Sequence, residues 1–224
     1  MNTRNAQIHG GRTHSLRVLA VPGSLRDGSY NRALVRAACE LAPDSVLVEP
    51  YDVAEIPFYD EDVEAAGDPE PVSRFKRAID RADALLIATP EYNAGPSGVL
   101  KNALDWASRP PRTSVLAGKP VAIMGASPSR GGTARAQAQL ALVLESTGAA
   151  IVPNGQLRVA HASAKFDDTD VPTLADNETR HALRTLLEAL HRAVDAAGTA
   201  IPGPDSHQAG ITDPSTSMPE PAAA

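Results

Sequence analysis

The sequence predicts an α/β fold in which five parallel strands form a doubly wound sheet of order 2-1-3-4-5. Apolar runs of strand length alternate with stretches that have the hydrophobic periodicity of helices. The run 84–89 is apolar almost throughout, which is typical of a central parallel strand covered by helices on both faces. No internal repeat relates these β–α units, so they favour an open sheet.

The first half of the chain supplies two strands and a long connection. A strand at 16–21 leads through a turn into a helix that ends near residue 42, with Leu34, Ala38 and Leu41 on its apolar face. A second strand covers 45–51. The connection 52–71 is rich in Asp, Glu and Pro, and we expect no regular element in it. Its aromatic pair, Phe58 and Tyr59, is expected to pack against the domain.

The second half completes the alternation. The spacing predicts helices over 72–82, 99–106 and 133–147, strands over 84–89 and 120–125, and an irregular fifth strand over 149–159. The last helix has the clearest pattern, with Leu183, Leu186, Leu187, Leu190 and Val194 on one face. Gly198 is predicted to end it.

Length and composition indicate a single domain with polar ends. Of the 224 residues, 16–197 form the predicted domain, 1–15 a flexible leader, and 198–224 a disordered tail rich in Pro, Ala and Ser. The net charge of −6 argues against a nucleic-acid partner. No apolar run reaches the ~18–20 residues of a membrane span. The N-terminus lacks the apolar core of a secretion signal, so the cytoplasm is the expected location.

Cysteine and histidine chemistry is not indicated. Cys39 is the one cysteine of the chain, so no internal disulfide forms, and a buried, inert thiol is expected within the first helix. The six histidines are scattered without metal-ligand spacing, and no metal site is assigned.

Three loops are expected to meet beyond the carboxyl ends of the strands. In the order 2-1-3-4-5 the strand order reverses between strands one and three, which is where such sheets bind ligands. The loops 22–31 and 90–98 follow those two strands, and the loop 126–132 flanks them. The sequence therefore places a binding crevice among these three segments.

The first loop has the composition of a phosphate site. It joins a strand to a helix start, where free N–H groups favour an anion. The hydroxyls of Ser24 and Ser29, the Asn31 amide and the forked Arg26 cation suit a phosphate as well. The alternative is a solvated turn in which Ser29 is the N-cap of the helix.

Three motifs together resemble the NADPH-dependent FMN reductase family, a flavodoxin-like group that includes quinone, azo-dye and chromate reductases. They are Gly23-Ser24-x-Arg26-x-x-Ser29-x-Asn31, Pro90-Glu91-Tyr92-Asn93 and the segment 100–106, Leu-Lys-Asn-Ala-Leu-Asp-Trp. The similarity extends over about 16–196, with the motifs in the right order and spacing.

The resemblance implies non-covalent FMN, with its phosphate in the first loop and its ring against the second. It also implies contacts from the loop 127–132, although Pro128 stands where many relatives have Gly. The cofactor-binding residues that it implies are Ser24, Arg26, Ser29, Tyr30, Asn31, Pro90, Glu91, Tyr92, Asn93, Ser127 and Gly131. Without the resemblance, Tyr92 reads as a core aromatic and Glu91 as a helix-entry charge; in similar proteins Glu91 is a partner across a subunit contact.

The expected activity is an NAD(P)H oxidoreductase that passes electrons through FMN to a flavin, quinone, azo compound or oxyanion. No catalytic residue is assigned, because the cofactor carries the chemistry. The sequence leaves NADPH or NADH open; Arg109, Arg112 and Arg130 are candidates for the 2′-phosphate by charge alone. The resemblance implies a homodimer or homotetramer, with the segment 101–106 near the interface. The predicted helix also offers Val99, Leu100 and Trp106 to an interface, beside the proposed site.

Two alternatives stay open at this point. A flavodoxin-type carrier would bind FMN without NAD(P)H turnover, but it typically has a threonine-rich phosphate loop, whereas this loop has Arg26. A flavin-dependent regulator without turnover is the third interpretation.

Overall fold

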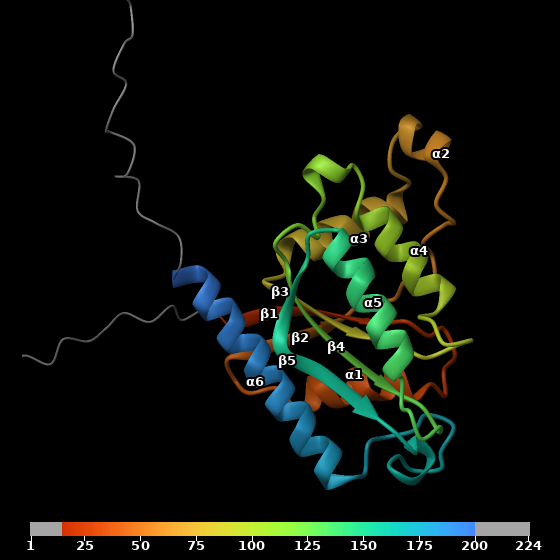
Figure 1. Cartoon of the computed structure of the whole chain (residues 1–224), viewed down its shortest axis with the longest axis vertical. Coiled ribbons are helices and arrows are strands. Elements are labelled where there is room, and N and C mark those ends of the chain that lie inside the picture. Colours follow the sequence, from red (N-terminus) through yellow and green to blue (C-terminus); the bar gives the residue numbers. More distant parts are fainter. Residues whose placement is uncertain (1–14, 200–224) are drawn as a thin grey trace, which may run out of the picture.

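Five parallel strands form one sheet in the order β2-β1-β3-β4-β5, as the sequence predicts (Figure 1). This computed structural model describes residues 15–199. The strand order reverses at β1, which pairs with β2 on one side and with β3 on the other. The strands are β1 (Leu16–Pro22), β2 (Val46–Pro50), β3 (Ala84–Ala88), β4 (Pro120–Ala126) and β5 (Ala150–Val159).

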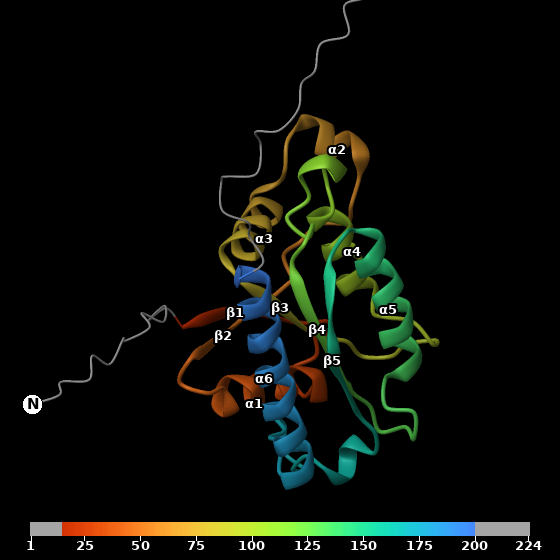
Figure 2. The same cartoon turned by 60° about the vertical axis from the view of Figure 1, so that its left-hand side comes forward.

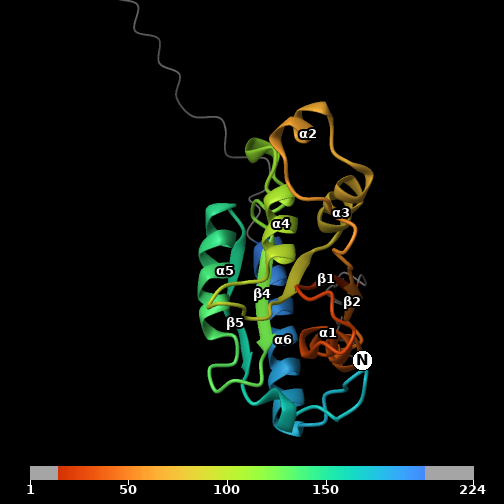
Figure 3. The same ribbon diagram turned by 90° about the vertical axis from the view of Figure 1, so that its right-hand side faces the viewer.

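Helices cover both faces of the sheet, which gives three layers (Figures 2 and 3). One face packs against α1 (Tyr30–Leu41) and α6 (Asn177–Thr199), and the other against α3 (Glu70–Arg81), α4 (Gly98–Ala107) and α5 (Ala134–Ser146). Each interface is a separate apolar core. All five residues of β3 are buried, as expected for a strand covered on both sides.

Helix α1 begins immediately after the first loop. The Ser29 hydroxyl caps it by accepting the N–H groups of Asn31 at 3.2 Å and Arg32 at 3.4 Å. Leu34, Ala38 and Leu41 are buried, so the predicted apolar face is the one that packs on the sheet. The interpretation of Ser29 as N-cap is therefore confirmed, and it fixes the end of the loop.

The connection 52–71 is more regular than predicted. It contains α2 (Glu61–Ala66), which Asp60 caps by accepting the N–H of Asp62 at 2.9 Å. Acidic residues in the first turn stabilise this short helix through the helix dipole, although none of its residues is buried. Helix α3 begins at Glu70, with Pro71 in its first turn, where the missing proline N–H costs nothing.

The aromatic side chains beside α2 differ from the expectation. Tyr59 packs edge-on against Trp106, with ring centroids 5.0 Å apart. Trp106 is 0% exposed and its indole N–H donates to the Pro57 carbonyl at 2.9 Å. Phe58, in contrast, is 86% exposed, so the predicted packing is wrong for this residue. Leu100 is also fully buried, so neither it nor Trp106 is available at a subunit interface.

The C-terminal elements follow the prediction with one difference, the end of α6. Strand β5 is irregular, as expected: its register against β4 shifts between Val121 and Ile123, near Asn154 with its φ of 57°. Helix α6 continues through Gly198 to Thr199, so Gly198 does not end it. The predicted leader and tail lie almost wholly outside the described residues.

Cys39 is exposed, so the prediction of a buried thiol is wrong. Its Sγ donates to the Val48 carbonyl at 3.5 Å. Desolvation nevertheless raises the pKa of the thiol, which is the opposite of what a reactive cysteine needs. Within residues 15–199, no helix is both long enough and apolar enough to cross a bilayer.

Candidate functional site

A cleft of about 230 Å³ opens beyond the carboxyl ends of β1, β3 and β4. It lies where the strand order reverses, and the three loops that follow these strands supply its walls. Its lining consists of Ser24, Arg26, Ser29, Tyr30, Asn31, Pro90, Glu91, Tyr92, Ala126, Ser127 and Pro128.

This lining contains all of the predicted site residues except Asn93 and Gly131. Both exceptions are exposed: Asn93 lies in a tight turn, and Gly131 lies in the loop between β4 and α5. Ala126 and Pro128 line the cleft but were not predicted. Ala126 offers no functional group that a sequence motif would reveal. Pro128 replaces the glycine of many relatives, so the resemblance does not indicate it as a site residue.

Two buried hydroxyls face the start of α1. Ser29 Oγ accepts the N–H groups of Asn31 and Arg32, and Ser24 Oγ accepts the N–H of Arg26 at 3.4 Å. Because both oxygens act as acceptors in these bonds, both hydroxyl hydrogens can donate to a ligand. The first turn of α1 carries no acidic residue that would repel an anion.

Arg26 supplies a cation beside these hydroxyls. Its guanidinium lies over Gly28, where an added Cβ would be 3.1 Å from Nη1. Among the described residues it has no acidic partner, whereas Arg32 pairs with Asp52 at 3.1 Å and donates to the Ser24 carbonyl. Arg26 is therefore exposed and free to meet an anion in the cleft.

Asn31, which lines the cleft, also has a structural role that the sequence did not predict. Its side-chain amide donates to the Ala126 carbonyl at 3.1 Å and its oxygen accepts the Ala126 N–H at 2.9 Å. These two bonds leave one amide hydrogen for a ligand. Asn31 is thus mainly a buried link that fixes the first loop to the end of β4.

A second link fixes the first loop to α4. The Ser97 hydroxyl, which caps α4, donates to the Gly23 carbonyl at 2.5 Å. Gly125 brings the end of β4 close as well, because an added Cβ there would lie 2.0 Å from Thr133 Oγ1 and 2.5 Å from the Thr89 carbonyl oxygen. The cleft walls are therefore held by direct contacts between loops.

Glu91 binds the N-terminus of α5 within the same subunit. Its carboxylate accepts the Arg135 side chain at 2.7 Å and the N–H groups of Arg135 and Ala136 at 3.0 and 3.3 Å. Burial disfavours the charged form, but these hydrogen bonds outweigh it and lower the pKa of Glu91. Glu91 is therefore neither simply solvated nor free for a partner across a subunit contact.

The four residues after Glu91 form a tight turn at the cleft edge. Tyr92 and Gly95 each donate their N–H to the other's carbonyl, at 3.0 and 2.9 Å. The central residues Asn93 and Ala94 have φ values of 50° and 67°, as in a type I′ turn. A left-handed alanine costs about 1 kcal/mol, so this turn is strained at Ala94.

Tyr92 is 57% exposed, so its interpretation as a core aromatic is wrong. Gly95, which ends the turn, lies outside the cleft lining. An added Cβ on Gly95 would lie 3.1 Å from Gln139 Oε1. The close approach that Gly95 permits is therefore to α5.

The three arginines considered for the 2′-phosphate lie in different regions. Arg109 binds Glu64 at 3.0 Å and lies just after α4, at the end of the sheet opposite the cleft. Arg112 lies in the 3₁₀ turn η1 (Pro111–Thr113) before β4, at that same end. Arg130 alone lies in a loop that borders the cleft, two residues after Pro128.

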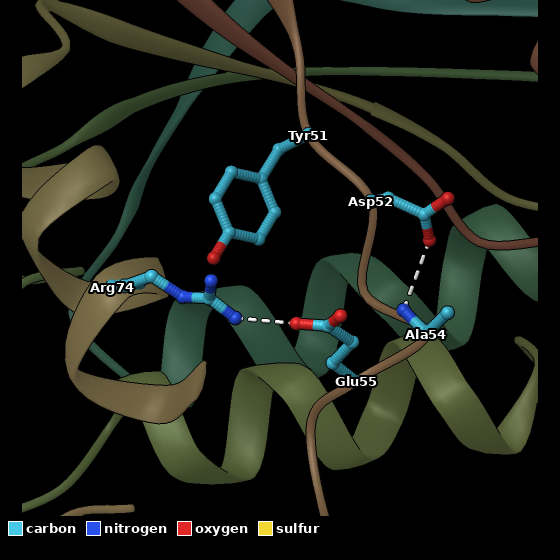
Figure 4. Close-up of a pocket in the computed structure, with 5 residues that line it drawn as sticks. All are labelled: Tyr51, Asp52, Ala54, Glu55 and Arg74. Carbon is cyan, nitrogen blue, oxygen red and sulfur yellow. Dashed lines mark hydrogen bonds and ion pairs between the residues drawn. The ribbon is translucent and has the colours of Figure 1, made fainter. Parts of the chain in front are cut away.

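A larger hollow of about 420 Å³ lies after the edge strand β2 (Figure 4). The Tyr51 phenol points toward Arg74, which forms an ion pair with Glu55, and Asp52 accepts the Ala54 N–H. Its cation and carboxylates are thus already bonded to one another or to the backbone. The hollow also follows the edge strand β2, whereas the strand order reverses between β1 and β3, so we assign function to the cleft.

The cleft suits a ligand that brings its own chemistry. One end offers two hydroxyls, a helix start and a free guanidinium, which fit a phosphate. The other end offers Pro90, Tyr92 and backbone groups, which fit a flat ring. These two sets of groups together fit a phosphorylated cofactor with a flat ring, such as FMN.

Comparison with known proteins also indicates an FMN-dependent protein. The model of the family described as NADPH-dependent FMN reductase matches residues 16–164. An NAD(P)H-dependent FMN reductase of Pseudomonas aeruginosa is 45% identical over 78% of this chain and 93% of its own length. An NAD(P)H:quinone oxidoreductase of Solanum tuberosum is 40% identical over 78% of this chain and 91% of its own.

A solved structure also has this fold. The flavoenzyme NAD(P)H:(acceptor) oxidoreductase FerB of Paracoccus denitrificans superposes with a TM-score of 0.73 at 31% identity. The match covers 81% of this chain and 98% of the other.

Proposed function

The chain belongs to the NADPH-dependent FMN reductase family, and we propose that its cleft holds FMN and reduces quinones with electrons from NAD(P)H. It is an FMN-dependent NAD(P)H oxidoreductase, and the flavodoxin-type carrier is not favoured. The observation that supports the FMN site is the free Arg26 guanidinium beside the Ser24 and Ser29 hydroxyls.

In this proposal the residues of the cleft bind FMN and orient its ring. Ser24, Arg26 and Ser29 hold the phosphate at the start of α1, and one hydrogen of the Asn31 amide completes the set. Pro90, Tyr92 and the backbone of the following turn border the ring. Ser127 and Pro128 close the opposite wall. Bound FMN would supply the redox chemistry between NAD(P)H and the second substrate, so the residues of the cleft need only hold and orient it.

The names of the relatives support a quinone as acceptor. Besides the plant quinone oxidoreductase, a Burkholderia protein that is 38% identical over 78% of this chain is a 2-hydroxy-1,4-benzoquinone reductase. The open cleft edge and the exposed Tyr92 are compatible with a flat aromatic substrate stacking above the ring. Free flavin, azo compounds and oxyanions are the competing acceptors.

The test of the proposed function is anaerobic reduction. The purified protein, loaded with FMN, is mixed with NADPH or NADH while its visible spectrum is followed. We expect the flavin absorbance to bleach within seconds, and benzoquinone to restore it. A yellow protein that stays oxidised with both nucleotides would support the carrier or the regulator instead.

The expectations on assembly and location also stand as proposals. We propose a homodimer or homotetramer, which the family relationship supports, and a cytoplasmic location. The interface does not use Leu100 or Trp106, which are buried inside the subunit. Light scattering at micromolar concentration tests the assembly, and a monomer would contradict it.

A further inference from the structure

We propose that Gln139 and Arg135 of α5 are positioning residues that hold the turn 92–95 in its left-handed conformation at the cleft edge. This inference rests on the proposed function, because the turn matters there as the border of the bound flavin ring. Neither residue lines the cleft. Gln139 acts through the turn itself, and Arg135 acts through Glu91, the residue before the turn.

Helix α5 binds the turn on both sides of Tyr92. The Gln139 side chain donates to the Ala94 carbonyl at 3.0 Å, and Arg135 Nε donates to Glu91, the residue before the turn, at 2.9 Å. Arg135 and Gln139 are four residues apart, so they share one face of the helix. The two contacts therefore form a clasp around the segment that carries Tyr92.

The strain in the turn explains why a clasp is needed. Type I′ turns favour glycine at the second central position, but Ala94 occupies it here with φ of 67°. The Gln139 amide bonds the carbonyl of this strained residue. Gly95, which has no Cβ, lets Gln139 come close enough to do so. Without the clasp, the alanine is expected to relax toward negative φ and to move Tyr92.

A purely structural contact would behave differently from a positioning one. If Gln139 only attached α5 to the domain, its loss would not change how flavin binds. If it holds the turn, replacing Ala94 with glycine should compensate for its loss, because glycine adopts positive φ without strain. The ring end of the cofactor should be affected and the phosphate end should not.

The experiment compares Gln139→Leu, Ala94→Gly and the double variant with the unmodified protein. Leu142→Ala is the matched control, since Leu142 is a 67% exposed residue of the same helix. Dissociation constants for FMN and riboflavin come from flavin-fluorescence titration. Exchange of the Tyr92 and Gly95 amide hydrogens, followed by NMR in the protein without flavin, reports the turn directly.

We expect Gln139→Leu to lower the affinities for FMN and for riboflavin by the same factor. This factor should be about three- to tenfold, as for one lost hydrogen bond. The two amides should exchange faster, and Ala94→Gly should restore most of the affinity in the double variant. Arg135→Ala should have a smaller effect, because the backbone N–H groups of Arg135 and Ala136 still bind Glu91.

Unchanged amide exchange in Gln139→Leu would overturn the clasp itself. Faster exchange with unchanged flavin affinity would overturn its positioning role, as would a loss of FMN affinity alone. If the unmodified protein binds neither flavin, the proposed function fails and the positioning role fails with it. In that case the exchange rates still decide whether α5 holds the turn.

Discussion

Arg26 is the residue through which the phosphate end of the cleft is best tested. A charge-assisted hydrogen bond to a phosphate contributes about 1.5–3 kcal/mol to binding. Arg26→Ala should therefore lower the affinity for FMN by about ten- to a hundredfold. Riboflavin lacks the phosphate, and its affinity should hardly change. Fluorescence titration with both flavins measures this.

Arg112→Ala is the matched control, an exposed arginine at the opposite end of the sheet. It should bind both flavins as the unmodified protein does. Equal FMN affinities in Arg26→Ala and Arg112→Ala would remove Arg26 from the site and leave the phosphate to Ser24, Ser29 and Asn31.

Gly125 tests how closely the cleft walls approach. An added Cβ would lie 2.0 Å from Thr133 Oγ1, so Gly125→Ala must force the end of β4 and the start of α5 apart. Overpacking of this kind lowers the free energy of unfolding by about 1–3 kcal/mol. An added Cβ on Gly131, in the loop that follows β4, meets nothing within 4 Å, so Gly131→Ala is the control. Urea denaturation should separate the two variants; equal stabilities would show that the wall yields easily.

Glu91 is expected to make the stability of the protein depend on pH. Its folded-state pKa is lowered, so its contribution to stability is complete above the unfolded value of about 4.3 and is lost as the pH falls through the folded pKa. Glu91→Gln should therefore reduce the free energy of unfolding by about 1 kcal/mol at pH 7. The difference should disappear at acidic pH. A difference that is constant across the pH range would show that ionisation of Glu91 does not matter.

At the scale of elements, the segment around α2 is attached to the domain through α4. Tyr59 packs on Trp106, its backbone N–H donates to Asn102 at 2.8 Å, and its hydroxyl donates to Glu64 at 2.6 Å. Trp106 is the buried centre of this attachment. Within the segment 100–106, Leu100 and Trp106 thus pack inside the subunit and are not available to an interface, whereas Lys101 is exposed.

Trp106→Ala should lower the free energy of unfolding by about 3–5 kcal/mol, because a fully buried aromatic leaves a cavity. Phe58 precedes Tyr59 and is 86% exposed, so Phe58→Ala should change the free energy of unfolding by no more than about 0.5 kcal/mol. Chemical denaturation of both variants gives the comparison. Similar losses in the two would mean that Phe58 is covered in solution, for example by a second subunit.

At the scale of the whole molecule, the domain is predicted to function without the C-terminal segment. Residues 200–224 have only isolated apolar residues such as Ile201 and Ile211, which cannot form a core face. A chain ending at Thr199, the last residue of α6, should keep its melting temperature and its flavin affinity. Thermal denaturation and FMN titration of the shortened chain test this, and a large loss in either would assign the segment a role.

The sequence alone determined the sheet order and the three loops at its carboxyl edge. Strand, turn and helix signals are local, so Ser24, Arg26 and Ser29 could be placed beside one another from their spacing. Ser29 caps α1 for the same local reason. The helix α2 was missed, although its cap Asp60 and its acidic first turn are local signals, because it lacks the apolar periodicity that defines longer helices.

The tertiary structure decided what the side chains of those loops do. Asn31 bonds Ala126 across 95 residues of sequence, and Glu91 bonds Arg135 across 44, so neither partner can be read from a motif. The same holds for Trp106, whose burial depends on Pro57 and Tyr59. Sequence patterns specify local conformation and which face is apolar, whereas the choice of a polar partner depends on distances that exist only after the elements have packed.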